Sequence, residues 1–462
     1  MPVIKEMAQQ RLAGRISEIL RGPRYPEKEF TLSGCTYNDV YQMACALKSS
    51  FSSLNFGNHP VCLCTESKAV MAASLLARLS GGPPLIFPYA QTDHVLSEMH
   101  QLTGFRFAIA DTKKALPEGV ESVLPDRSSR CELELVDEAV VHPDKELLSL
   151  FTGGSTGTPK FWSKTVTNLF GEALYLSEKY DITQDDRVVA TVSPYHIYGL
   201  LYSVLVPLVS SAGVADDIYT FPHEIISAIG AYAATVLVGV PMHYRALGSR
   251  KIPGNSLRIA FSSTGALAET DGDAFYKKNG VGIVEIYGST ETGGIATRCR
   301  AEGENYFVPY DHLEWKIIED RLHVLSEFIS PEIEREQDGF FKTGDRVQSD
   351  GHTGFMLLGR TDDIIKVGGK RVNLEEIRNK LNTIPGVRDS FVISLPVRTG
   401  RQNVVAAVVE GKPDRTHLRQ SLAHMLEPYA MPRSIKFVDK IPVTASGKYD
   451  RQAIEQLFRT KL

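Results

Sequence analysis

Cysteine is scarce in this chain, and its distribution argues against the chemistry that thiols usually supply. Six cysteines occur in 462 residues, and no two have the Cys-x-x-Cys spacing of zinc or redox motifs. Cys62 and Cys64 lie two positions apart in a short apolar run, which predicts that both face one side of a buried strand. We therefore expect reduced thiols with no catalytic or metal-binding role.

Long apolar runs and an excess of positive charge are also missing. No stretch reaches the roughly 20 apolar residues that a membrane-spanning helix needs. Residues 1–20 carry charges throughout, unlike the apolar core of a signal peptide. The net charge of −4 argues against a nucleic-acid partner. These absences predict a cytoplasmic protein with no membrane insertion and no nucleic-acid partner.

The sequence does contain a regular alternation of short apolar runs and helix-like segments. Uninterrupted apolar runs are typical of parallel strands that are buried on both faces of a sheet. Ligands bind at the carboxyl ends of such strands. Strands are predicted at residues 60–64, 85–87, 107–110, 187–192, 235–240, 257–262 and 282–287, and helices at 68–79 and 168–180.

The pattern changes near residue 315. Residues 313–319 and 321–325 predict antiparallel strands, and Asp350-Gly351 predicts a hairpin turn. A smaller α+β unit is expected after these strands, with strands at residues 389–395, 403–410 and 434–437 and helices at 374–382 and 418–427. We therefore expect two domains, residues 1–359 and residues 360–462.

One segment has the composition of a loop that binds phosphate. Residues 150–160, LFTGGSTGTPK, combine three glycines, several hydroxyl side chains and a lysine directly after an apolar run. Glycine lets backbone N–H groups approach an anion, while the hydroxyls and Lys160 add donors and positive charge. A Walker A loop is excluded, because Pro159 precedes Lys160 and Phe161 follows it. The sequence therefore predicts a phosphate-binding loop of another kind.

Further segments place polar or aromatic side chains in loops, several of them directly after predicted strands. Each alone fits an ordinary turn, a solvated linker or an exposed lysine at least as well as it fits a site. Read as a site, a tyrosine stacks on a base, a glutamate holds Mg²⁺ near phosphates, and an aspartate accepts from both ribose hydroxyls. The segments are residues 194–199 (PYHIYG), 263–266 (STGA), 287–291 (YGSTE), 341–345 (FKTGD), 359–372 (GRTDDIIKVGGKRV) and 442–448 (PVTASGK).

In this order, the loop and these segments resemble the core motifs of the adenylate-forming superfamily, which contains acyl- and aryl-CoA synthetases. The resemblance implies an α/β fold: a large N-terminal domain of two stacked α/β subdomains plus a β-barrel-like part, with a small mobile α+β C-terminal domain. It also implies ATP-dependent activation of a carboxylic acid to an acyl-adenylate. The acyl group then passes to the pantetheine thiol of CoA or of an acyl carrier protein.

The resemblance assigns nucleotide contacts to residues of each motif. The glycine-rich loop wraps the β- and γ-phosphates of ATP, Tyr287 stacks on the adenine, and Asp345 binds the ribose hydroxyls with support from Arg360. The full set that it implies is Thr152, Gly153, Gly154, Ser155, Thr156, Gly157, Lys160, Thr264, Gly265, Ala266, Tyr287, Gly288, Ser289, Asp345, Arg360 and Arg371.

The resemblance also implies a catalytic set and a moving domain. Lys448 corresponds to the catalytic lysine of the superfamily. Glu291 is implied to hold Mg²⁺ and Thr290 to touch the α-phosphate, and His196 completes the expected catalytic set. Asp362 matches the hinge, about which the small domain rotates between the two half-reactions.

The acid and its acceptor are defined more loosely. The residues expected to border the acid or the pantetheine arm are Tyr198, Val240, Ser263, Gly293, Gly294, Gly368 and Gly369. In the superfamily, members that activate amino acids carry an aspartate at this aromatic motif to bind the α-ammonium group. Residues 195–198 contain no acidic side chain, so the resemblance implies an aryl or medium-chain acid instead of an amino acid. CoA and a carrier protein both stay open as acceptors, and a homodimer stays open as the assembly.

The chain departs from the superfamily pattern in three places. Gly153 stands where serine is usual, Phe161 and Trp162 stand where glycine and valine are usual, and residues 322–331 lack the usual glycine-rich segment. The loop glycines and Lys160 are nevertheless all present.

Two alternatives to the expected activity remain. One is adenylation without thioester formation, against which the predicted pantetheine residues argue mildly. The other is a nucleotide-binding protein without catalysis. The presence of both Glu291 and Lys448 argues against this second alternative.

Overall fold

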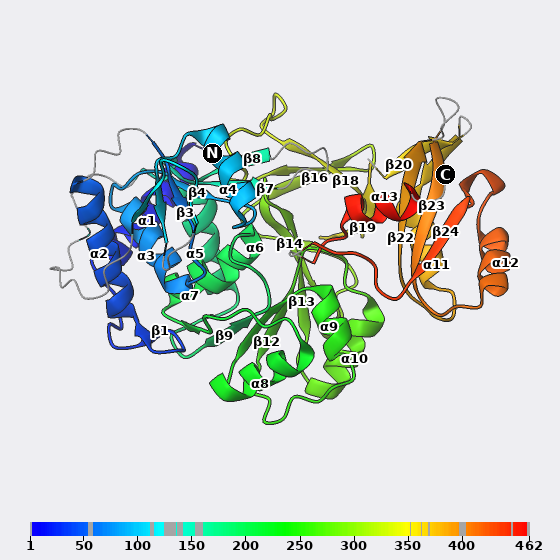
Figure 1. The fold of residues 1–462 in the computed structure, drawn as a ribbon, viewed down its shortest axis with the longest axis horizontal. Helices are drawn as coiled ribbons and strands as arrows, with labels where there is room; N and C mark the ends of the chain where they lie inside the picture. Colours follow the sequence, from blue (N-terminus) through cyan, green and yellow to red (C-terminus); the bar gives the residue numbers. More distant parts are fainter. Residues whose placement is uncertain are drawn as a thin grey trace. The chain divides into compact units, whose positions relative to one another are not determined.

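In this computed structural model the chain folds as two compact units, and Figure 1 labels many of their helices and strands. The first unit comprises Met1–Glu314 and Leu325–Glu334, and the second comprises Trp315–Val324 and Arg335–Leu462. Among the helices that the structure describes, none combines the length and the apolar composition that a membrane span requires. The described residues are 2–53, 59–110, 115–123, 135, 142–152, 160–351, 353–361, 363–367, 370–396, 403–444 and 447–459.

A six-stranded sheet forms one part of the first unit, in the order β6-β5-β3-β4-β7-β8. Neighbouring strands are parallel except β7 and β8, which are antiparallel. The sulfur atoms of Cys62 and Cys64 lie 3.6 Å apart, which confirms that both side chains face the same side. The strands are β3 Val61–Leu63, β4 Leu85–Phe87, β5 Phe107–Ile109, β6 Glu121–Val123, β7 Glu146–Thr152 and β8 Lys160–Thr165.

A nine-stranded sheet forms the other part, in the order β15-β14-β13-β12-β11-β9-β10-β1-β2. Parallel pairing runs from β13 to β1, as the apolar runs predict, and β14, β15 and β2 add antiparallel edges. Helices α8, α9 and α10 pack along this sheet (Figure 1). The strands are β1 Glu29–Thr31, β2 Cys35–Thr36, β9 Arg187–Ala190, β10 Gly213–Val214, β11 Val236–Gly239, β12 Ile259–Ser262, β13 Ile283–Ser289, β14 Gly293–Cys299 and β15 Val308–Pro309.

Helix α3 is buried along almost its whole length. Nζ of Lys68, the first residue of the helix, donates to three successive backbone carbonyls, those of Ala215, Asp216 (2.7 Å) and Asp217. These bonds hold the start of α3 against the segment that follows β10. Burial lowers the pKa of Lys68 to about 8, although Asp216 and Asp217 oppose the shift.

The predicted helix 168–180 begins with a π-helical turn, η1, and continues as α5. The helices of the first unit are α1 Pro2–Leu20, α2 Tyr37–Ser53, α3 Lys68–Leu79, α4 Asp93–Thr103, η1 Thr167–Gly171, α5 Glu172–Lys179, α6 Ile197–Leu200, η2 Leu201–Leu205, α7 Val206–Ser210, α8 Pro222–Tyr232, α9 Pro241–Leu247, α10 Glu269–Asn279 and η3 Arg300–Glu302.

The second unit contains a four-stranded sheet, β16-β17-β18-β19, in which β18 is antiparallel to both β17 and β19, a hairpin of β20 and β21, and a three-stranded sheet, β22-β23-β24. Helices α11 and α12 pack on one face of the three-stranded sheet, and α13 packs on the other. The elements are β16 Glu314–Ile318, β17 Arg321–Leu325, β18 Phe341–Ser349, β19 Phe355–Arg360, β20 Ile364–Val367, β21 Lys370–Asn373, α11 Leu374–Asn382, β22 Val387–Pro396, β23 Asn403–Gly411, α12 Arg415–Met425, η4 Pro428–Ala430, β24 Ser434–Val438 and α13 Arg451–Arg459.

The fold class expected from the sequence is confirmed, and the local predictions hold with small shifts. The hairpin at Asp350-Gly351 forms, and the N–H of Asp350 donates to the Gly354 carbonyl at 3.0 Å. The helix predicted at 418–427 instead begins at Arg415, because Asp414 accepts from the N–H of His417 at 2.7 Å and caps it earlier. A domain boundary between residues 359 and 360 stays a prediction.

Candidate active site

Three of the expected site segments, together with Val240, meet at one edge of the nine-stranded sheet. Strands β13, β12, β11 and β9 are neighbours and run parallel, so their carboxyl ends lie at the same edge. The residues at or after these ends are 287–291, 263–266, Val240 and 194–199. The sheet therefore gathers side chains that are far apart in the sequence.

The backbone is strained where β12 ends. Thr264 has φ of +73°, a left-handed conformation that a β-branched residue rarely adopts. Its Oγ1 is buried and has no hydrogen-bond partner among the described residues. The Ser263 hydroxyl, by contrast, donates to the carbonyl of Ile286 on β13 at 3.0 Å. Such strain concentrates at ligand-binding sites, and nothing in the sequence indicated it.

A tight turn between β13 and β14 carries Thr290 and Glu291. The N–H of Ser289 donates to Oγ1 of Thr292 at 3.1 Å, and the two hydroxyl oxygens lie 2.8 Å apart. The N–H of Ser330 donates to the Glu291 carbonyl at 2.8 Å. The turn's backbone is therefore fixed from two sides, while the side chains of Thr290 and Glu291 stay partly exposed.

Three glycines frame this turn because no side chain fits at their positions. A Cβ at Gly288 would lie 2.3 Å from the Gly293 carbonyl oxygen. At Gly293, whose φ is +68°, it would lie 2.6 Å from Oε2 of Glu172, and at Gly294 it would lie 2.6 Å from the Tyr310 ring. Gly293 and Gly294 thus pack against Glu172, a buried residue that the motifs did not single out. That Gly293 and Gly294 also border the carboxylic acid substrate stays a prediction.

Tyr195 anchors the loop that holds His196 to the six-stranded sheet. Its buried hydroxyl donates to the Thr65 carbonyl at 2.6 Å and accepts from the Thr65 N–H at 3.1 Å, just beyond β3. His196 is half-buried and directly precedes α6. Tyr195 was not predicted as a site residue. Its partner is the backbone of Thr65, which is distant in the chain, and a backbone group leaves no pattern of side chains in the sequence.

Tyr198 and Val240 are both buried beside this loop. The Tyr198 hydroxyl donates to the Gly239 carbonyl at 3.1 Å, and burial raises the pKa of Tyr198 well above its ordinary value. Gly199 has no room for a side chain, since a Cβ there would lie 2.0 Å from the Ser193 carbonyl oxygen. The start of α6 is therefore closely packed.

The predicted phosphate-binding loop connects β7 to β8. Thr152 and Lys160 are paired across these antiparallel strands, so the loop leaves and rejoins the sheet at one place. The Lys160 side chain is exposed. The loop residues Gly153, Gly154, Ser155, Thr156 and Gly157 lie outside the described part of the chain.

Asp345 and Arg360 are brought together in the second unit. Their backbones are paired between β18 and β19, and Nη1 of Arg360 lies 3.6 Å from Oδ1 of Asp345. Gly344 makes room for the guanidinium, since a Cβ there would lie 2.6 Å from Nη2 of Arg360. The resemblance expected this pairing, and the ribose contact itself stays a prediction.

Lys448 is exposed in a turn of the second unit, where the Thr444 N–H donates to the Lys448 carbonyl at 2.7 Å. The side chain of Arg371 on β21 is not described, and Asp362, Gly368 and Gly369 lie outside the described residues. The hinge and the pantetheine residues therefore stay predictions.

Family models match most of the chain. Residues 21–327 match the model described as AMP-binding enzyme, and residues 376–448 match the AMP-binding enzyme C-terminal domain.

Among characterised proteins, the chain is 26% identical to a sulfoacetate–CoA ligase of Cupriavidus necator, over 94% of this chain and 95% of that protein. It is 27% identical to an indoleacetate–CoA ligase of Aromatoleum aromaticum, over 78% and 77% respectively.

Solved structures share the fold. ATP-bound MatB from Rhodopseudomonas palustris superposes with a TM-score of 0.81 at 22% identity, over 97% of this chain and 99% of that one. O-succinylbenzoate coenzyme A synthetase from Bacillus subtilis, in complex with ATP and a magnesium ion, gives 0.79 at 19% identity, over 96% and 99%.

Proposed function

Because this chain belongs to the AMP-binding enzyme family, within the adenylate-forming superfamily, we propose that it activates a carboxylic acid with ATP and passes the acyl group to a pantetheine thiol. One observation carries the proposal: the segments with His196, Thr264 and Glu291 follow the parallel strands β9, β12 and β13 of one sheet, whose carboxyl ends lie at one edge. The similarity to two acyl-CoA ligases supports the same reaction class.

The residues at this edge fit a nucleotide and Mg²⁺. The buried Oγ1 of Thr264 lacks a partner among the described residues, as expected of a hydroxyl group that binds a ligand. No cluster of three or more potential metal ligands occurs in the described residues. Mg²⁺ at nucleotide sites needs only one or two carboxylates together with phosphate oxygens, so Glu291 suffices on the protein side. When bound, Mg²⁺ supplies positive charge that stabilises the negative charge on the phosphates.

In the first half-reaction, a carboxylate oxygen of the acid attacks the α-phosphorus of ATP. The new O–P bond forms as the bond to pyrophosphate breaks. Both reactants are anions, so positioned cations and N–H donors supply much of the catalysis. We assign the phosphate contacts to residues 152–160 and Thr290, and the cation at the reacting carboxylate to Lys448.

In the second half-reaction, the pantetheine thiolate attacks the acyl carbon and AMP leaves. Lys448 then has no role, and Gly368 and Gly369 line the path of the pantetheine arm. The small domain rotates at Asp362 between the two half-reactions, so that Lys448 serves the first and Gly368 and Gly369 serve the second. Domain closure of this kind is common among enzymes. Asp345 and Arg360 hold the ribose.

The acid remains a class rather than a compound. Residues 195–198 contain no acidic side chain, and buried Tyr198 and Val240 offer apolar surface. We therefore propose an aryl or medium-chain acid. CoA is the favoured acceptor, because both relatives are named as CoA ligases, and a carrier protein is the alternative.

ATP–pyrophosphate exchange across a panel of benzoates, cinnamates, fatty acids and amino acids tests the proposal. Exchange that depends on one class of acid is expected, followed by thioester formation when CoA or a carrier protein is added. Exchange without a thioester product would support the alternative in which the enzyme forms the adenylate but no thioester. ATP binding with no exchange for any acid would favour a non-catalytic nucleotide-binding protein.

A further inference from the structure

Two charged side chains are buried behind the turn that carries Glu291. Lys164 on β8 is 0% exposed and Glu172 at the start of α5 is 2% exposed. Neither Nζ of Lys164 nor Oε2 of Glu172 has a hydrogen-bond partner among the described residues. Buried charges are costly unless something compensates them, so their retention calls for a reason.

Glu172 contacts the turn directly. Its Oε1 accepts from the N–H of Gly294 at 2.7 Å. Its other oxygen occupies the space beside Gly293 where a Cβ would otherwise lie. Gly293 and Gly294 come two and three residues after Glu291, so the position of the Glu172 carboxylate sets where β14 begins and where the turn ends.

Lys164 interacts electrostatically with three carboxylates. Burial lowers its pKa, and the negative charges of Glu172, Glu291 and Glu332 oppose that shift. Lys164 in turn counteracts the effect of burial, which raises the pKa of Glu172. Lys164 thus acts electrostatically both on Glu172, which holds the turn, and on Glu291, which lies in the turn.

The surrounding backbone fixes this arrangement. Oε1 of Glu332 accepts from the N–H of Ser163, next to Lys164, at 3.1 Å. Ser330, two residues earlier, donates to the Glu291 carbonyl. One short segment, residues 330–332, is therefore bonded both to the strand that bears Lys164 and to the turn that bears Glu291.

We propose that Lys164 and Glu172 are positioning residues that hold the Thr290–Glu291 turn and keep the Glu291 carboxylate available to Mg²⁺. Glu172 fixes the turn through Gly294 and compensates Lys164. Without the charge of Glu172, the positive charge of Lys164 acts on Glu291 and Glu332 alone, and it competes with Mg²⁺ for Glu291. The proposal rests on the proposed function, since it assumes that Glu291 holds the metal.

The test measures Mg²⁺-dependent binding of a non-hydrolysable ATP analogue by calorimetry, in the wild type, Glu172→Gln and Lys164→Met/Glu172→Gln. The amide in Glu172→Gln keeps the shape and an oxygen acceptor for Gly294. The Mg²⁺ concentration for half-maximal binding should rise about tenfold in Glu172→Gln, as is common when a residue behind a metal ligand is changed. The double variant removes the competing lysine and should return to within about threefold of the wild type.

Glu178→Gln is the matched control on the same helix, because Glu178 is half-exposed and bonds to Arg15 at the surface. It should leave the Mg²⁺ dependence unchanged. An unchanged Mg²⁺ dependence in folded Glu172→Gln, or a double variant as weak as the single one, would overturn the proposal. If Glu172→Gln does not fold, the double variant decides alone: near-wild-type Mg²⁺ affinity is expected, and a loss beyond tenfold overturns the proposal.

Failure of the proposed function has a different result. If wild-type protein binds the analogue equally with and without Mg²⁺, the role of Glu291 is wrong. If it binds with Mg²⁺ but catalyses no exchange with any acid, the activity is wrong while the positioning role stands.

Discussion

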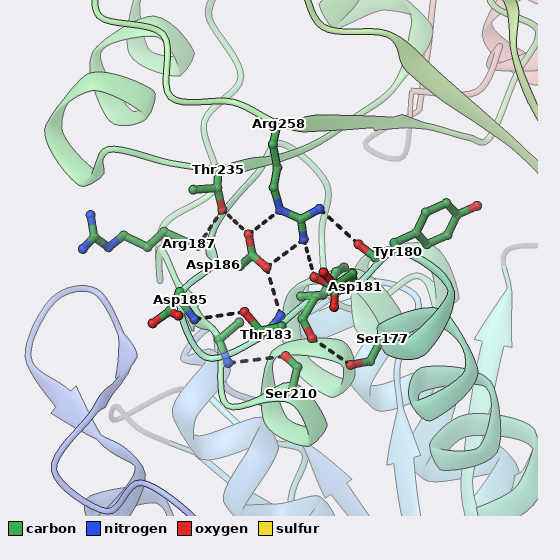
Figure 2. Close-up of polar contacts among 12 residues, drawn as sticks. Ser177, Tyr180, Asp181, Thr183, Asp185, Asp186, Arg187, Ser210, Thr235 and Arg258 are labelled. Atoms are coloured by element: carbon green, nitrogen blue, oxygen red, sulfur yellow. Dashed lines mark hydrogen bonds and ion pairs between the residues drawn. The ribbon is translucent and has the colours of Figure 1, made fainter. Parts of the chain in front are cut away.

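Arg258 forms a two-bonded ion pair with Asp186 that joins separate segments of the first unit (Figure 2). Its Nε donates to Oδ1 of Asp186 at 2.8 Å and its Nη2 to Oδ2 at 2.7 Å. The Thr235 hydroxyl and the Thr183 N–H also donate to this carboxylate, at 2.6 and 2.9 Å. Arg258 further donates to the Tyr180 carbonyl at 3.1 Å. The pair therefore connects the end of α5 to the amino ends of β9, β11 and β12.

Loss of this pair should destabilise the protein in a pH-dependent way. Burial alone would raise the pKa of Asp186, but hydrogen bonds from Arg258, Thr235 and Thr183 outweigh burial and lower it. A carboxyl with a lowered pKa stabilises the fold above its unfolded pKa of about 4 and loses that contribution as the pH falls below it. Arg258→Met should cost about 2 kcal/mol at pH 7, less than for a fully buried pair because Arg258 is 39% exposed.

Urea unfolding of the wild type and Arg258→Met at pH 7 and pH 3 measures this difference, which should narrow at pH 3. Arg11→Met removes an exposed pair with Glu178 and should change stability by less than about 0.5 kcal/mol. An equal difference at both pH values would show that the Asp186 charge is not what Arg258 stabilises.

Tyr195→Phe should impair adenylation although Tyr195 is outside the expected catalytic set. The variant removes the hydroxyl that is bonded to Thr65 and frees the loop that holds His196. We expect kcat for ATP–pyrophosphate exchange to fall about tenfold, since small displacements at an active site have costs of this size or larger. Tyr89→Phe is the control, because its hydroxyl bonds to Glu98 at 2.6 Å, and it should keep wild-type kcat. Equal kcat values in Tyr195→Phe and Tyr89→Phe would show that the Tyr195 hydroxyl does not anchor the loop that holds His196.

A methyl group should be tolerated very differently at two glycines. Gly199→Ala places a Cβ 2.0 Å from a backbone oxygen, so the start of α6 must shift, and we expect a lower unfolding temperature and weaker acid-dependent exchange. Gly230→Ala on α8 meets nothing within 4 Å and should stabilise the helix by about 0.5–1 kcal/mol. Thermal unfolding of both variants checks this, and a neutral Gly199→Ala would show that the packing there is loose.

Two substitutions in the second unit should separate the half-reactions. Lys448→Ala should abolish formation of the adenylate but spare thioester formation from supplied acyl-adenylate. Gly369→Leu should do the reverse, because a side chain there obstructs the pantetheine arm. Each half-reaction is assayed separately, with exposed Lys440→Ala as the control for a lost surface lysine. Folded variants that lost both halves equally would contradict domain alternation.

Local patterns predicted the bounds of some elements closely because the causes of those elements are local. The run at residues 68–79 has no glycine or proline and became α3 with those bounds, and the three-residue apolar run at 85–87 became β4 unchanged. The paired Asp345 and Arg360 were expected from the motifs and lie on adjoining strands. The early start of α12 at Arg415 depended on one capping side chain, Asp414, which hydrophobic periodicity does not register.

The sequence by itself determined those strands and helices that local patterns predicted, the family and the motif residues, since apolar periodicity and short motifs are read within a few positions of the chain. Only the tertiary structure decided which charges are buried and what they face. Lys164, Glu172 and Glu332 look like ordinary surface charges in the sequence, and the fold brings Lys164 under the influence of the other two and of Glu291. Burial and electrostatics depend on distances across the fold, and the packing of strands and helices sets those distances.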